Sequence, residues 1–202
     1  MARGTKAQRH EQKRREQEAR QKAAARKRGI RMVGIGAALA VAIVLLLVAI
    51  WPEPLEGDTT AESWDLPQLS GEGRVALADF SGKPTVAAFF ASWCTVCEEE
   101  IPQFLNVSEQ LGDQVNFVGI NTQDSGRGMG DAEKWGIARA WPLARDIGGG
   151  SGSGLSTGTF GMRGSPLTVL YDEQGTVVHV QRGGISGSQL LQTLEQLFGV
   201  TV

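Results

Sequence analysis

The stretch AFFASWCTVCEEEIP, residues 88–102, contains the only two cysteines of the 202-residue chain, Cys94 and Cys97. The apolar run TVAAFFAS at 85–92 leads into them and has the length expected of a strand that is buried on both faces. The residues that follow, TVCEEEIPQFLNVSEQLG, predict a helix that ends at Gly112. The pattern therefore places Cys94 where a central strand passes into the first turn of a helix.

This spacing suits two thiols that open and close a local disulfide. Residues i and i+3 of a helix share a face, within the roughly 4.4–6.8 Å Cα separation that a disulfide tolerates. The unpaired backbone N–H groups of a first helical turn stabilise a thiolate. We therefore expect Cys94 to be the attacking residue and Cys97 to resolve the mixed disulfide.

Other interpretations of the pair are weaker. A structural zinc site needs four ligands, and the chain adds only His10 and His179 to the two cysteines. A structural disulfide stabilises most when it closes a long loop, whereas this pair is three residues apart. Two cysteines without a function would be unusual in a domain outside the cytoplasm, where the charge pattern described below puts this one. We expect redox chemistry, with no metal ion and no cofactor besides a Cys94–Cys97 disulfide.

The rest of the sequence predicts a mixed-sheet α/β domain, because strands and helices alternate along it. Besides the run at 85–92, the predicted elements are strands at 75–80 and 115–121, a helix at 131–140, a hairpin at 166–182 and a closing helix at 186–199. The apolar face of the closing helix is expected to comprise Leu190, Leu191, Leu194, Leu197 and Phe198.

The segment GGGSGSGLSTG at 148–158 predicts a mobile surface loop without regular structure. A phosphate-binding loop is the alternative, but the G-K-[ST] sequence that such a loop requires does not follow it.

Four motifs together resemble the thioredoxin fold and, within it, the membrane-anchored TlpA/ResA-like thiol-disulfide oxidoreductases. WCTVC (93–97) matches the W-C-x-x-C of that family, and EIP (100–102) matches the E-x-P that follows it. FGMRGSP (160–166) matches Tyr/Phe-Gly-x-Arg-Gly-x-Pro, and the D-x-x-G motif lies within YDEQG (171–175). The resemblance covers roughly residues 62–198 and implies a thioredoxin-like fold, a mixed central sheet flanked by helices.

The resemblance also implies roles for residues near the pair. Pro166 is expected to follow a cis peptide bond, to face the cysteines and to present the backbone of Ser165 to a substrate, with Trp93 also in contact. Glu100 is expected to influence cysteine ionisation and proton transfer. The alternative for Glu100 is a glutamate that merely favours the helix dipole.

The sequence departs from the family pattern in two places. Thioredoxins bury an aspartate six residues before the first cysteine, and this chain has Ala88 there. Most relatives carry a proline between the cysteines, where this chain has Thr95 and Val96. That dipeptide influences the redox potential. Three adjacent glutamates disfavour a thiolate while the helix terminus favours it, so the direction of electron flow stays open.

The residues before the domain differ from it in charge. Residues 1–31 hold twelve Lys and Arg against three Glu, whereas residues 52–202 hold eight against nineteen Asp and Glu. Between them, MVGIGAALAVAIVLLLVAIW (32–51) carries no charge and is long enough, as a helix, to cross a ~30 Å hydrocarbon core. The positive-inside rule then puts the basic segment in the cytoplasm and the domain outside.

Two alternatives concern this N-terminal part. The first is a cleavable signal peptide, which is disfavoured because its apolar core usually has only about 7–15 residues and the run at 32–51 is longer. Nucleic-acid binding by the basic segment is disfavoured because no aromatic residue interleaves its charges. The expected organisation is a basic cytoplasmic segment (1–31), a transmembrane helix (32–51), a linker (52–62) and an extracytoplasmic thioredoxin-like domain (63–202).

The sequence thus predicts a single-pass membrane protein whose outer domain exchanges disulfides with other proteins. The resemblance implies a reductant that serves apocytochrome c or another envelope substrate and draws electrons from a membrane thiol transporter. A disulfide donor to secreted proteins, recharged by a membrane oxidase, is the alternative. A thiol peroxidase is less favoured because FFASWCTVC lacks the threonine spacing of a peroxidatic motif, and a non-catalytic binding module also remains open.

Overall fold

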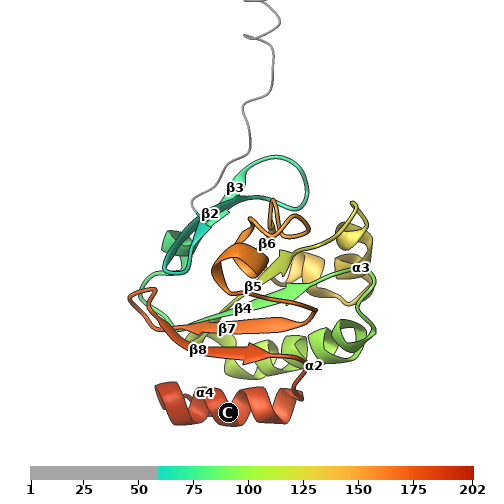
Figure 1. Ribbon diagram of the computed structural model, residues 1–202. Coiled ribbons are helices and arrows are strands. Elements are labelled where there is room, and N and C mark those ends of the chain that lie inside the picture. The colour runs from blue at the N-terminus through green and yellow to red at the C-terminus, as the bar shows by residue number, and fades with distance from the viewer. Residues whose placement is uncertain (1–58) are drawn as a thin grey trace, which may run out of the picture. The chain divides into compact units, whose positions relative to one another are not determined.

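The computed structural model describes residues 59–202, which form two sheets and three α-helices (Figure 1). The larger sheet has the strand order β6-β5-β4-β7-β8, and a three-stranded sheet has the order β1-β2-β3. The strands are β1 Thr59–Thr60, β2 Ser63–Pro67, β3 Arg74–Ala76, β4 Thr85–Phe90, β5 Asn116–Asn121, β6 Leu143–Arg145, β7 Leu167–Tyr171 and β8 Val177–Arg182. The α-helices are α2 Thr95–Leu111, α3 Gly128–Lys134 and α4 Gly187–Phe198.

Strand β4 is the central strand of the larger sheet, and all six of its side chains are buried. It pairs in parallel with β5, with Val86 opposite Phe117, and antiparallel with β7, with Val86 opposite Leu170. Helix α2 makes the connection between the parallel strands, and β7 and β8 form an antiparallel hairpin. The predicted mixed α/β sheet and its C-terminal hairpin are therefore confirmed.

The alternation of side chains along β4 divides the core into two clusters. Ala88 and Phe90 belong to the cluster formed with the three α-helices. Ala87 and Phe89 belong to the opposite cluster, formed with β2, β3 and the segment around Leu155. Figure 1 shows α2 and α4 on one side of the sheet and β2 and β3 on the other.

Helices α2 and α4 end at the predicted glycines. Gly112 ends α2 with a φ of 54°, and its N–H donates to the Ser108 carbonyl. Gly199 ends α4 in the left-handed region. The buried face of α4 is narrower than predicted, because Leu197 is 45% exposed.

The predicted strand at 75–80 is wrong from Leu77 onward. Strand β3 ends at Ala76, and a 3-10 helix, η1 Leu77–Phe80, follows it. The Ala76 N–H donates to Asp79 Oδ2 at 2.8 Å, which caps this turn. Because Leu77 and Phe80 are three residues apart, the tight turn buries both.

The predicted helix at 131–140 is displaced and interrupted. Helix α3 begins at Gly128 and ends at Lys134, and a 3-10 helix, η3 Ile137–Arg139, follows it. Gly136 separates the two with a φ of 83°, a conformation that ends a helix. The short strand β6 was not predicted, because three residues are too few to show a period.

The glycine-rich segment 148–158 is more ordered than the sequence predicts. Residues Leu155–Thr159 form one π-helical turn, η4. Leu155 and Ser156 are completely buried. The prediction of a loop without regular structure is therefore wrong for the second half of this segment.

The predicted basic segment and transmembrane helix lie outside the described residues, as does the linker up to residue 58. Strand β1 pairs Thr60 with Ser63 of β2, so backbone pairing begins within the segment assigned to the linker. Among residues 59–202, no helix has both the length and the apolar character needed to cross a membrane.

Candidate active site

The two cysteines lie where β4 passes into α2. Cys94 is the N-cap of α2, and its sulfur is bonded to that of Cys97, with 5.3 Å between the two Cα atoms. The Cys94 N–H donates to the Ala91 carbonyl at 3.0 Å, which fixes the turn before the helix. The predicted position of the pair, at the start of the helix after the central strand, is therefore confirmed.

The two sulfur-bearing residues differ in their access to solvent. Cys94 is 5% exposed, whereas Cys97 is completely buried. The Cys97 N–H donates to Cys94 Sγ at 3.0 Å. Such a donor, at the positive end of a helix, stabilises a thiolate on Cys94 when the pair is reduced. Cys94 is thus the more accessible residue of the pair and the one suited to attack an external disulfide.

Glu100 lies three residues beyond Cys97 on the same helix and is only 2% exposed. The Ile185 N–H donates to its Oε1 at 2.8 Å, and its Oε2 is buried with no hydrogen-bond partner among the described residues. Burial raises the pKa of Glu100 to about 7, although the hydrogen bond from Ile185 acts in the opposite direction. A glutamate that only complemented the helix dipole would remain in solvent.

Pro166 follows a cis peptide bond after Ser165, as the family resemblance implied. The neighbouring Gly184 approaches the cysteine turn so closely that an added Cβ would lie 2.4 Å from Val96 Cγ1 and 3.9 Å from Pro166 Cγ. Pro166 therefore lies close to the dipeptide between the cysteines. The Ser165 hydroxyl is buried and has no partner among the described residues.

Trp93 is the most exposed aromatic residue beside the pair, with 55% of its surface accessible. Its Nε1 donates to the Gln123 carbonyl at 2.9 Å, so the indole ring is oriented although it is exposed. Gln123 has a φ of 52°, an uncommon conformation for a residue with a side chain. The structure thus places the predicted residues Trp93, Glu100 and Pro166 around the disulfide.

Comparison with known proteins assigns this arrangement to a family. Residues 58–196 match the family described as Redoxin. The chain belongs to the Redoxin family.

Two relatives and one solved structure show which kinds of protein the Redoxin domain is similar to. The thiol:disulfide interchange protein DsbE of Pseudomonas aeruginosa is 31% identical over 74% of this chain and 82% of its own length. The thiol-disulfide oxidoreductase ResA of Halalkalibacterium halodurans is 25% identical over 67% of this chain and 73% of its own. A secreted Mycobacterium tuberculosis disulfide oxidoreductase, homologous to E. coli DsbE, has a TM-score of 0.55 at 25% identity and covers 66% of this chain and 95% of its own.

These similarities confirm the resemblance to thiol-disulfide oxidoreductases and the thioredoxin-like fold. The chain is an oxidoreductase of the DsbE/ResA type with a Cys-x-x-Cys pair. Membrane anchoring stays a prediction.

A hydrogen-bond network behind the cysteine turn of the Redoxin domain was missed in the sequence. Both the backbone N–H and the hydroxyl of Ser92 donate to Asp124 Oδ2, and Asn121 Nδ2 donates to the same oxygen. Partial burial acts to raise the pKa of Asp124, but these hydrogen bonds together lower it. Ser92 follows β4 and Asp124 follows β5, and the carboxyl ends of adjacent parallel strands meet at one edge. That rule could have found the network.

The described part of the Redoxin domain contains no group of three or more His, Cys, Asp or Glu placed to hold a metal ion. His179 lies on β8 opposite Leu170, half-buried, and is not among the residues around the disulfide. The expectation that the chain needs no further cofactor stays a prediction.

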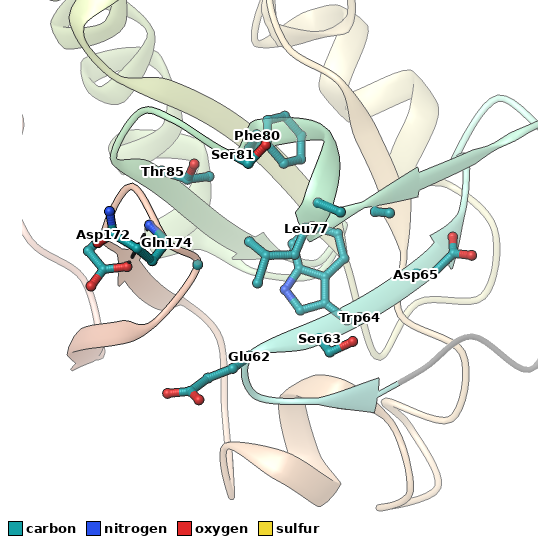
Figure 2. Close-up of a pocket in the computed structure, with 13 residues that line it drawn as sticks. Glu62, Ser63, Trp64, Asp65, Leu77, Phe80, Ser81, Thr85, Asp172 and Gln174 are labelled. Atoms are coloured by element: carbon teal, nitrogen blue, oxygen red, sulfur yellow. Dashed lines mark hydrogen bonds between the residues drawn. The ribbon is translucent and has the colours of Figure 1, made fainter.

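The Redoxin domain also contains a cavity of about 510 Å³ that is separate from the disulfide (Figure 2). Trp64 and Thr85, the first residue of β4, are both part of its wall. Cys94 follows the opposite end of β4, and six strand residues span roughly 20 Å. The Asp172 carboxylate at its edge already accepts a hydrogen bond from Gln174 N at 2.9 Å. This cavity therefore takes no part in the chemistry of the pair.

Proposed function

We propose that this oxidoreductase exchanges disulfides with protein substrates through Cys94, and that it acts as a reductant of the cytochrome c maturation type. The observation that carries the exchange reaction is the asymmetry of the disulfide. Cys94 keeps 5% of its surface exposed and Cys97 keeps none, and the Cys94 sulfur accepts a backbone N–H at the start of a helix. The reductive direction is the one that the family resemblance of the sequence implies, and the similarity to DsbE and ResA supports the exchange chemistry itself.

In the reductive direction, the Cys94 thiolate attacks one sulfur of a substrate disulfide. A bond forms between Cys94 and that substrate sulfur, and the second substrate sulfur leaves as a thiolate that takes up a proton. Cys97 then loses its proton and attacks Cys94 Sγ, which releases the first substrate sulfur. Two electrons have passed to the substrate, and the Cys94–Cys97 disulfide has formed.

Glu100 is the proposed acceptor of the Cys97 proton. It lies one helical turn beyond Cys97, is buried and has a pKa raised to about 7, which suits proton transfer at neutral pH. Pro166 and Ser165 are proposed to form the groove that receives the substrate strand, with Trp93 at its edge. A membrane thiol transporter would restore the dithiol, and the domain would lie outside the cytoplasmic membrane.

The opposite direction is the second candidate, and one observation favours it. The N–H of Cys97 and the helix terminus stabilise a Cys94 thiolate, which stabilises the reduced pair and makes the disulfide more oxidising. A domain of this kind would donate disulfides to secreted proteins. The two candidates share the same exchange chemistry and differ in redox potential.

The exchange reaction is tested with insulin as the disulfide substrate and the full-length chain purified in detergent. Cys94→Ser should abolish insulin reduction, whereas Cys97→Ala should accumulate a mixed disulfide between Cys94 and an insulin chain. Circular dichroism establishes that both variants are folded. Activity in folded Cys94→Ser, or no mixed disulfide in folded Cys97→Ala, would contradict the proposal. Rapid peroxide consumption by the wild-type chain would favour a thiol peroxidase.

A further inference from the structure

A groove of about 690 Å³ begins at Trp93 and runs along the glycine-rich segment. Trp93 and Gln123 line it, together with Thr157 and three glycines of the segment 148–158. Residues 161–163, which lead to Pro166, complete it. The groove thus adjoins the cysteine turn on one side and the segment leading to the cis proline on the other.

The glycine-rich wall is held in place by one buried carboxylate, that of Asp146. Asp146 Oδ1 accepts from Leu155 N at 2.7 Å, and Oδ2 accepts from Ser156 N and Thr122 Oγ1, both at 2.9 Å. Glycine is required at 149, because a Cβ there would lie 2.1 Å from Thr122 Oγ1. These hydrogen bonds fix residues 155 and 156, next to the lining residue Thr157. This part of the groove is therefore pre-organised, which lowers the conformational-entropy cost of binding a segment there.

The groove offers hydrogen-bond donors and carries one charge. Arg163 is its only charged lining residue, and it is exposed and has no hydrogen bond or ion pair within residues 59–202. The Thr157 hydroxyl is buried and has no partner among the described residues. A guanidinium binds a carboxylate through two parallel hydrogen bonds.

We propose that this groove binds the residues beside the target cysteine of a protein substrate and selects a segment with an Asp or Glu that pairs with Arg163. The inference rests on the proposed exchange reaction, because it assigns the substrate class of the same site. The Trp93 ring, held by Gln123, supplies a flat wall for an extended segment. Residues 52–202 carry a large excess of acidic residues, so the preference concerns one carboxylate at a fixed position rather than acidic proteins in general.

The test uses the reduced full-length Cys97→Ala chain in detergent and a panel of peptide disulfide dimers. Each peptide has one cysteine and carries Asp, Asn or Lys at one of the three positions before or after it. Mass spectrometry follows the mixed disulfide with Cys94 and gives a second-order rate constant. We expect Asp to exceed Asn about fivefold at one position. The preference should weaken as salt is added.

Three variants in the Cys97→Ala background separate charge recognition from a structural effect. Arg163→Gln should bring the Asp-to-Asn ratio to about one, and Arg163→Glu should make the Lys peptide react faster than the Asp peptide. Arg139→Gln, which removes an exposed arginine outside the groove, should keep the fivefold ratio.

The inference would be overturned by equal Asp and Asn rates at every position, or by a preference that survives Arg163→Gln. If no peptide of any sequence formed a mixed disulfide, the exchange reaction itself would be refuted, and the groove assignment with it. The Asn peptide therefore distinguishes the two failures, because it must react if exchange occurs at all.

Discussion

The backbone N–H of Ile185 donates to Glu100 Oε1 at 2.8 Å and ties a buried carboxyl on α2 to the loop between β8 and α4. The other carboxyl oxygen has no partner among the described residues. Burial therefore raises the pKa of Glu100 to about 7, so the carboxyl keeps its proton up to about that pH. One expected effect of this carboxyl follows from its burial, and a second follows from its position one helical turn beyond Cys97.

The first effect is on stability. The pKa of Glu100 is about 7 in the folded chain and has an ordinary value of 4.5, so the folded state binds more protons between these pH values. The free energy of unfolding of the oxidised chain should therefore fall as pH rises from 4.5 to 7 and level off above 7. This group alone accounts for a loss of up to about 3 kcal/mol.

Urea unfolding of the full-length oxidised chain at pH 5 and pH 8 measures this loss. Glu100→Gln should reduce the difference between the two pH values, whereas Glu99→Gln, at an exposed position of the same turn, should leave it unchanged. A difference in Glu100→Gln as large as that in the wild type would show that Glu100 does not titrate in this range.

The second effect is on the resolving step. If Glu100 takes the Cys97 proton, Glu100→Gln should slow the attack of Cys97 on a mixed disulfide roughly 10²-fold at pH 7. Rapid-quench mass spectrometry follows the decay of a mixed disulfide with a peptide. The wild-type rate should rise through about pH 7, whereas the variant rate should rise only near the ordinary thiol pKa of about 8.5. Identical pH profiles would remove Glu100 from the proton transfer.

Gly184 is expected to be essential for the approach of its loop to the cysteine turn. In Gly184→Ala, the Cβ would lie 2.4 Å from Val96 Cγ1, so either the loop or the dipeptide must shift. We expect a loss of about 1–3 kcal/mol in the free energy of unfolding and slower insulin reduction. Gly164→Ala is the matched control, because a Cβ there meets nothing within 4 Å. Equal effects of the two substitutions would argue against close packing at Gly184.

Asp146 is expected to hold the glycine-rich segment by charge as well as by shape. Asp146→Asn replaces one acceptor oxygen with an N–H₂ group that faces donors from Thr122, Leu155 or Ser156. The expected loss is about 1–3 kcal/mol in the free energy of unfolding, with faster hydrogen exchange at residues 154–159. Asp113→Asn, at an exposed position, should show neither effect. Unchanged exchange in folded Asp146→Asn would show that other contacts fix the segment.

The parts of the site that the sequence predicted depend on local pattern. An unbroken apolar run predicted β4, and Gly112 predicted the end of the helix that follows it. The two cysteines lie between these signals, so they were expected at the beginning of the helix. The family motif then supplied the cis bond before Pro166. No pattern of spacing would have indicated that bond, because proline at the start of a strand is ordinary.

The parts that the sequence did not predict depend on contacts between distant residues. The composition of the glycine-rich segment predicts flexibility, but its second half is held by hydrogen bonds with Asp146, just after β6, and with Thr122, just after β5. Likewise, nothing near Glu100 in the sequence indicates that the Ile185 N–H, 85 residues later, would meet its carboxyl. Local propensity also failed at Leu77 and Phe80, where burial of both side chains selected a 3-10 turn.

The reduction potential of the Cys94–Cys97 pair is the most direct test of the proposed reductive function. The full-length chain is equilibrated with a series of thiol–disulfide buffers, and the oxidised fraction is measured after alkylation. A reductant should have a value at or below roughly −230 mV, on the side of thioredoxin at about −270 mV. A value between roughly −120 and −150 mV would contradict this direction and identify a disulfide donor.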